Sequence, residues 1–248
     1  MATLSRRDGQ LLEGEARSRL GPCDGPTFEV GAETRFREVL RYLGHAGQEI
    51  ASELEGRIRD AMARCEEVAR PMVVSRAFAV DALPLELPGR SIAEHLKDAK
   101  EATFFAATLG HGVDRELRRL SVEDPLGQVV FDAAATEAIE RLANKTEAQV
   151  RFAAAERGLY CSWRFSPGYG DLPLEVQPSL LTVLNATRRL GITLTPSNLM
   201  VPTKSVTAIV GMHPTPQPGL ASSCAICALR EFCVLRSRGF TCKNAKRG

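Results

Sequence analysis

The sequence predicts an α+β domain, because helical and strand-like patterns interleave along the chain without a regular β-α-β rhythm. Apolar residues recur at helical spacing in some stretches and run together over strand length in others. The 248 residues suffice for one large domain, and 44% hydrophobic with 25% charged residues is typical of globular proteins. We therefore expect a folded chain rather than a disordered one.

We expect three segments. Residues 1–26 are charged and glycine-rich, and two Gly-Pro pairs interrupt them, which indicates a flexible leader. Residues 27–213 should form the folded domain. Residues 214–248 combine a proline-containing linker with a cysteine-rich tail.

The first half of the domain should contain two helices between two strands. In the first helix Phe36, Val39 and Leu40 recur at helical spacing, and the second strand is rich in Val and Phe. The expected elements are a short strand over 28–30, helices over 33–43 and 48–69, and a strand over 72–80 after Pro71.

The middle of the domain should hold its longest helix. A short helix is expected after Ser91, whose hydroxyl is placed to cap it, with Glu94 completing a capping box. The next expected elements are a strand over 102–109, a helix over 113–120 and a helix from Pro125 to about Arg157. The long helix is apolar almost all round between residues 129 and 143, which favours burial.

The last part of the domain should return to the sheet. The expected elements are a strand over 159–165, a helix over 179–190 that ends at Gly191, and a strand over 205–210.

Several classes of protein are excluded. No apolar run approaches the roughly 20 residues that cross a bilayer, and the first 30 residues lack the apolar core of a signal peptide. The net charge of +2 and the lack of a long basic stripe argue against nucleic acid as a partner. Gly110-x-Gly112 is followed by Arg115 where a dinucleotide-binding motif needs its third glycine. We therefore expect a cytoplasmic protein without a Rossmann domain.

Two places stand out as candidate functional sites. Glu137 lies in the apolar part of the long helix, where a carboxylate costs several kcal/mol unless it is paired. It is either functional or at an edge with solvent access. In the strand over 159–165, Arg164 should project away from the apolar face, and the glycines of Gly168-Tyr169-Gly170-Asp171 allow tight turns and close approach of a ligand.

The chemistry of this second place suits a charged ligand. A guanidinium such as that of Arg164 binds a carboxylate with two parallel hydrogen bonds. An aromatic ring such as that of Tyr169 favours a sulfonium or another cation over its face. The alternative is a structural turn with a surface arginine.

The motif Arg164-x-x-x-Gly168-Tyr169 resembles the Arg-x-x-x-Gly-Tyr signature of the activation domain of cobalamin-dependent methionine synthase. The similarity continues in order from about Tyr160 to Gly211, through Gly191-Ile192-Thr193 and Met200-Val201-Pro202. The resemblance implies a mixed or antiparallel twisted sheet with flanking helices, here followed by a short cysteine-rich tail. The chain is too short for the homocysteine, folate and cobalamin modules, which implies a stand-alone protein acting on a separate core.

The resemblance also implies a function. The protein would bind S-adenosylmethionine and support the reductive methylation of inactive cob(II)alamin held by a methionine synthase core or another corrinoid protein. A low-potential donor, flavodoxin or ferredoxin, would supply the electron. Arg164 would bind the methionyl carboxylate, Gly168, Gly170 and the backbone near Asp171 would line the ligand, and Tyr169 would face the cobalt. Glu137 would be a supporting carboxylate.

Four cysteines in the tail predict a metal site. They are Cys224, Cys227, Cys233 and Cys242. The first pair has the two-residue gap of zinc and iron–sulfur sites, whereas the remaining spacing matches neither the ferredoxin nor the zinc-ribbon pattern. We favour a [4Fe-4S] cluster because the implied reaction consumes a low-potential electron, with zinc or unligated thiols as alternatives.

Two other functions keep the same fold. The chain could be a metal-bearing scaffold or sensor of a corrinoid system without its own S-adenosylmethionine chemistry. It could also be an electron-delivery protein in which the cysteine tail reduces the corrinoid directly. Binding of S-adenosylmethionine would separate the first of these from the leading interpretation.

Overall fold

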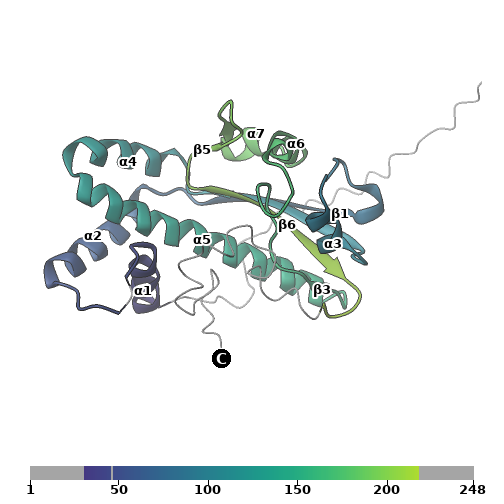
Figure 1. Ribbon diagram of the computed structural model, residues 1–248, viewed down its shortest axis with the longest axis horizontal. Coiled ribbons are helices and arrows are strands. Elements are labelled where there is room, and N and C mark those ends of the chain that lie inside the picture. The colour runs from purple at the N-terminus through teal and green to yellow at the C-terminus, as the bar shows by residue number, and fades with distance from the viewer. Residues whose placement is uncertain (1–30, 46, 218–248) are drawn as a thin grey trace, which may run out of the picture.

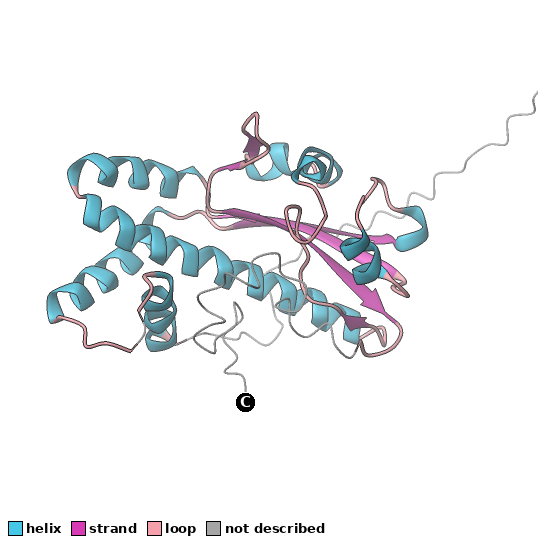
Figure 2. Ribbon diagram, in the orientation of Figure 1, coloured by secondary structure: helices cyan, strands magenta, loops and turns pink. Residues whose placement is uncertain are grey.

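The computed structural model describes residues 31–45 and 47–217. These residues form an antiparallel sheet with helices on both faces, which confirms the predicted α+β class (Figures 1 and 2). The main sheet has four strands in the order β1-β2-β6-β3. They are β1 (Met72–Ala79), β2 (Glu101–Thr108), β6 (Ser205–His213) and the short edge strand β3 (Tyr160–Cys161).

The central strands pair along their whole length. The register of β1 on β2 runs from Met72 opposite Thr108 to Ala79 opposite Glu101. In the pairing of β2 with β6, Phe104 lies opposite Ile209 and Phe105 opposite Ala208. Every residue of β2 after its first is buried, because the strand has a neighbour on each side and a helical layer on each face.

One face of the sheet is covered by α5 (Pro125–Ala155), the longest helix, which runs along the sheet in Figure 1. Phe105 of β2 and Val210 of β6 pack there with Ala143 and Val150 of α5. Asp124 caps the first turn of α5, because its side chain accepts a hydrogen bond from the amide of Gly127 at 3.0 Å.

Three further helices pack around α5 at the end away from β3 (Figure 1). They are α1 (Ala32–Tyr42), α2 (Ser52–Val68) and α4 (His111–Glu123).

The opposite face of the sheet is covered by short elements. Phe104 and Ile209 pack there with Leu180 and Leu184. The elements of this layer are α3 (Arg90–Leu96), α6 (Gln177–Val183), α7 (Ala186–Leu190) and the short helices Val80–Ala82 and Leu174–Val176. A two-stranded hairpin, β4 (Thr193–Leu194) with β5 (Met200–Val201), leads into β6.

The elements predicted over 33–43, 72–80, 102–109 and from Pro125 to about Arg157 are confirmed within two residues at each end. The strand predicted over 205–210 extends to His213. The helix predicted over 48–69 begins later, at Ser52, and the helix predicted over 113–120 is extended at both ends. The β4–β5 hairpin was not predicted. The strand over 28–30, the leader over 1–26 and the tail from residue 218 lie outside the described residues.

Three local predictions are wrong. The predicted capping box of Ser91 and Glu94 does not form. The helix α3 begins one residue earlier than expected, at Arg90, so the N-cap position is occupied by Gly89, which has no side chain to cap the helix. The helix predicted over 179–190 is two helices, because Asn185 adopts a left-handed conformation with φ of 51°.

The third wrong prediction is the strand over 159–165, which is regular only at Tyr160–Cys161. The carbonyls of Cys161 and Ser162 both accept hydrogen bonds of 2.8 Å from Arg151 of α5. Consecutive carbonyls of a regular strand point in opposite directions, so the chain leaves the sheet here. It returns at Phe165, which forms a single bridge with Ile209.

No helix among the described residues is long and apolar enough to cross a membrane.

Candidate functional site

Arg164 lies at the edge of the sheet with its guanidinium against α5. Its Nη2 donates to Asn144 Oδ1 at 2.8 Å and to Glu140 Oε2 at 3.2 Å. Its Nε lies 3.0 Å from Glu147 Oε2, and the side chain is 13% exposed. Within the described chain Nη1 makes no hydrogen bond, so its two N–H donors remain available for a ligand.

Phe165 fixes the direction in which Arg164 points. The amide of Phe165 donates to the carbonyl of Ile209 at 2.9 Å, and the amide of Ile209 donates back at 2.7 Å. The ring of Phe165 is fully buried in the layer that faces away from α5, next to Trp163. Because side chains of an extended segment alternate, Arg164 is directed towards α5.

The loop after Phe165 is closed by its own backbone. The amide of Gly168 donates to the carbonyl of Leu172 at 2.8 Å, and the amide of Leu172 donates to the carbonyl of Tyr169 at 3.0 Å. Gly168 and Gly170 have φ of 87° and 54°, in the left-handed region that favours glycine. This outcome agrees with the tight turns expected from the sequence.

The two glycines differ in what surrounds them. A Cβ on Gly170 would lie 2.7 Å from Ser91 Cβ, so the loop touches α3 there. A Cβ on Gly168 would meet nothing closer than Leu174 Cδ1 at 3.9 Å. Space therefore lies over Gly168, whereas Gly170 is part of a packed contact.

Asp171 joins the same loop to α3. Its carboxylate accepts hydrogen bonds from the amides of Arg90 at 2.7 Å and Ser91 at 2.9 Å. These bonds from the backbone of Ser91 and Arg90 lower the pKa of Asp171. The side chain of Asp171 is thus held by the helix, which leaves its backbone for contact with a ligand.

Tyr169 is half-exposed at the turn of the loop. Its ring lies edge-on to that of Phe165, with centroids 6.3 Å apart, and 53% of the residue is exposed. The contacts of Arg164 are with α5 and the ring contact of Tyr169 is with Phe165. The structure therefore brings Gly168, Tyr169, Gly170 and Asp171 into one loop, while Arg164 is held against the opposite layer.

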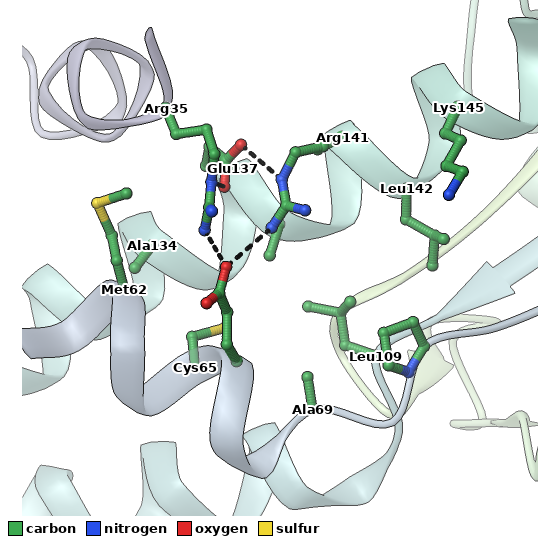
Figure 3. A pocket seen from close by; sticks show the side chains of 13 residues that line it. Arg35, Met62, Cys65, Ala69, Leu109, Ala134, Glu137, Arg141, Leu142 and Lys145 are labelled. Atoms are coloured by element: carbon green, nitrogen blue, oxygen red, sulfur yellow. Dashed lines mark hydrogen bonds and ion pairs between the residues drawn. The ribbon is translucent and has the colours of Figure 1, made fainter. Parts of the chain in front are cut away.

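Glu137 lies on another face of α5, in a cavity of about 270 Å³ between α1, α2 and α5 (Figure 3). It is buried, at 5% exposure, and Arg141 Nε donates to its Oε1 at 3.0 Å. Arg35 Nε lies 3.7 Å from its Oε2. Burial raises the pKa of Glu137, while the charges of Arg141 and Arg35 act in the opposite direction. Of the two interpretations of Glu137, the exposed edge position is wrong.

The residues that hold Arg164 are not among the site residues predicted from the sequence. Glu140, Asn144 and Glu147 recur at helical spacing and form a polar stripe along α5. That stripe was the available signal. Next to it, a hollow of about 460 Å³ is lined by residues of α1 and α5, among them Tyr42 and Thr136. Burial raises the pKa of Tyr42, and the negative charge of Glu140 adds to this effect.

No group of three or more His, Cys, Asp or Glu side chains that could hold a metal occurs in residues 31–45 and 47–217. The four candidate metal ligands Cys224, Cys227, Cys233 and Cys242 lie outside the described residues.

Comparison with known proteins adds two findings. The family described as "Vitamin B12 dependent methionine synthase, activation domain" matches residues 90–218, a range that includes β2, α5, the loop after Arg164 and β6. Among solved structures, the MetH reactivation domain bound to AdoHcy is similar in fold, with a TM-score of 0.54 and 18% identity. The match covers 78% of this chain and 80% of that one. No curated protein matches the chain.

Proposed function

Since the chain belongs to the family of vitamin B12-dependent methionine synthase activation domains, we propose that it binds S-adenosylmethionine and supports reductive methylation of inactive cob(II)alamin. The cobalamin is held by a partner, either a methionine synthase core or a related corrinoid protein. The solved MetH reactivation domain contains AdoHcy, which supports a ligand of this class.

The proposal rests mainly on the hydrogen bonding of the Arg164 guanidinium. Its guanidinium is fixed by Glu140, Asn144 and Glu147, yet its Nη1 has no hydrogen bond within the described chain. The methionyl carboxylate would accept charge-assisted hydrogen bonds from Nη1. The neighbouring carboxylates of Glu140 and Glu147 are suited to the α-ammonium group, because a zwitterion needs both charges within one site.

The loop would hold the other end of the ligand. Open space over Gly168 permits close approach of a nucleoside to the backbone. Gly170 and the backbone of Asp171 would complete the lining. The half-exposed ring of Tyr169 would lie beside the sulfonium and face the partner's cobalt. The supporting role of Glu137 rests on the resemblance alone, since Glu137 opens into a different cavity.

The chain would contribute position rather than a nucleophile. One external electron reduces the cobalt, the methyl–sulfur bond of S-adenosylmethionine breaks, and the methyl group passes to cobalt with AdoHcy as the leaving product. Holding the donor at the partner's corrin face supplies the proximity that such a transfer needs. Flavodoxin or ferredoxin is the proposed source of the electron. The cysteine tail is proposed to bind a [4Fe-4S] cluster or, alternatively, zinc.

Reactivation of a purified methionine synthase core loaded with cob(II)alamin tests the function. S-adenosylmethionine and a low-potential reductant should restore methylcobalamin when this protein is added, and should not do so when it is omitted. Titration calorimetry with S-adenosylmethionine separates this function from that of a metal-bearing scaffold. No heat of binding and no reactivation would reject the proposal.

A further inference from the structure

The cavity between α1, α2 and α5 combines fixed charges with an apolar wall. Its charged residues are Arg35 from α1, Glu66 from α2, and Glu137, Arg141 and Lys145 from α5. Figure 3 shows Arg35, Glu137 and Arg141 gathered on one side, with Ala69, Leu109 and Leu142 on the other. At about 270 Å³ the space is large enough for a small organic molecule.

Four of these charges compensate one another in a closed ring. Arg35 Nη2 forms an ion pair with Glu66 Oε1, and Arg35 Nε lies 3.7 Å from Glu137 Oε2. Arg141 bonds Glu137 at 3.0 Å and lies 3.8 Å from Glu66. Each arginine therefore touches both carboxylates, and the ring is electrically neutral.

The hydrogen-bond donors of the cavity that the ring leaves without a partner belong to positively charged side chains. Within the described chain, Lys145 Nζ and Arg141 Nη1 make no hydrogen bond or ion pair, although both residues line the cavity. Arg35 Nε is buried and has no hydrogen-bond partner among the described residues. With the ring neutral, Lys145 leaves one positive charge in excess, so the cavity favours an anion.

The wall on the other side of the ring offers hydrocarbon surface. It is formed by Ala69, Pro71, Leu109, Ala138 and Leu142, whereas Met62 lies beside Arg35 (Figure 3). The thiol of Cys65 is also in the lining, and burial raises its pKa to about 11, so it is neutral. A ligand that fits this wall carries an apolar tail.

We propose that this cavity is a second ligand site, for a small monocarboxylate with an apolar tail. The carboxylate binds Lys145 Nζ and Arg141 Nη1, and the tail lies against Leu109 and Leu142. One negative charge matches the one excess positive charge. The site is independent of the binding of S-adenosylmethionine proposed for Arg164, which lies against another face of α5.

The methyl group of Met62 lies in the same cavity, next to Arg35, and reports on its occupation. The chain has five methionines, and Met62 lines the cavity whereas Met72, Met200 and Met212 do not. With methyl-¹³C-methionine in the full-length protein, hexanoate should shift the Met62 signal in a saturable way and leave that of Met200 in place. Met62→Leu assigns the signal. The uncharged analogue hexanol should bind more weakly.

Substitution of Lys145 tests the contribution of its charge to binding, and because Lys145 is exposed the fold should be preserved. Lys145→Met should raise the dissociation constant for hexanoate by about fivefold or more, and Lys145→Arg should retain binding. Lys100→Met, at an exposed position outside the cavity, is the matched control and should bind like the wild type.

Three results would overturn the inference: no saturable shift of Met62, equal binding of hexanol and hexanoate, or wild-type affinity in Lys145→Met. Arg164→Ala should bind hexanoate normally while losing S-adenosylmethionine, so failure of one site is distinguishable from failure of the other.

Discussion

The carboxylate of Asp171 accepts a hydrogen bond from the amide of Ser91 at 2.9 Å, across 80 residues of sequence. With the parallel bond from Arg90 it provides the cap that α3 lacks locally. The loop that carries Gly168 and Tyr169 is therefore anchored on a helix of the same layer, and the conformation of the loop depends on that anchor.

Asp171→Ala should lower the melting temperature by a few degrees, because two amides at the start of α3 lose their acceptor. Asp171→Asn keeps an acceptor oxygen and should lose less. Since the folded-state pKa of Asp171 is lowered, its contribution is present above its ordinary pKa and is lost as pH falls through the folded value. Thermal unfolding at neutral pH and near pH 3 measures both effects. A melting temperature of Asp171→Ala equal to that of the wild type would contradict this prediction.

Gly168 and Gly170 of the loop both have a left-handed backbone, so the same substitution to alanine can be compared at the two positions. Gly170→Ala should destabilise the protein by about 1–3 kcal/mol, because the new Cβ meets Ser91 in a left-handed backbone. Gly168→Ala has space and should cost only about 1 kcal/mol of conformational strain. Denaturant unfolding compares them. The interpretation fails if Gly168→Ala is the more damaging change.

Arg164→Ala should weaken the binding of S-adenosylmethionine by about 2 kcal/mol or more, through loss of charge-assisted hydrogen bonds. Titration calorimetry measures the change. Arg157→Ala, which removes an exposed ion pair with Glu101, is the control and should leave the affinity unchanged. Wild-type affinity in Arg164→Ala would reject the role assigned to this residue.

Glu137→Gln should change how stability depends on pH. Because burial raises the folded-state pKa of Glu137, its ionisation costs stability, and this cost grows as pH rises above about 4.5. The free energy of unfolding of Glu137→Gln, relative to the wild type, should therefore increase from about pH 4 to about pH 7. Glu53→Gln on the surface of α2 controls for the lost charge. A relative stability independent of pH would show that the arginines compensate the burial fully.

Protein purified without oxygen should contain iron and sulfide if the cysteine tail holds a [4Fe-4S] cluster. Combined replacement of Cys224 and Cys227 with Ser should remove the metal and abolish any reduction of a corrinoid, while binding of S-adenosylmethionine persists. Cys161→Ser, in the described domain, is the control. Stoichiometric zinc in a colourless protein without sulfide would exclude the cluster.

The fold was largely predictable because its main elements depend on local apolar patterns. The largely apolar stretch of α5 over residues 129–143 and the apolar run of β2 are signals of burial, and both segments are largely buried in the structure. Two of the three local errors occurred where a residue from another element binds a backbone group. Asp171 replaces the expected cap of Ser91, and Arg151 draws the carbonyls after β3 out of the sheet.

The candidate site was predictable in part for the same reason. The motif from Arg164 to Tyr169 is local and could be read from the sequence. Its partners on α5 lie some 20 residues earlier, and only the folded sheet edge brings Asn144 within 2.8 Å of Arg164. Glu137 is a candidate from the sequence that the structure shows to be buried, but its neighbours Arg35 and Glu66 come from helices whose packing no local pattern reveals.

The full-length pairing of β1 with β2 has a practical consequence for dissecting the protein. A shortened version that starts at residue 90, where the family match begins, would strip β2 of one neighbour and uncover a row of unpaired amides and carbonyls beside Phe104. Exposed edges of this kind invite self-association. Any truncation intended to stay monodisperse should retain the chain from α1 onward.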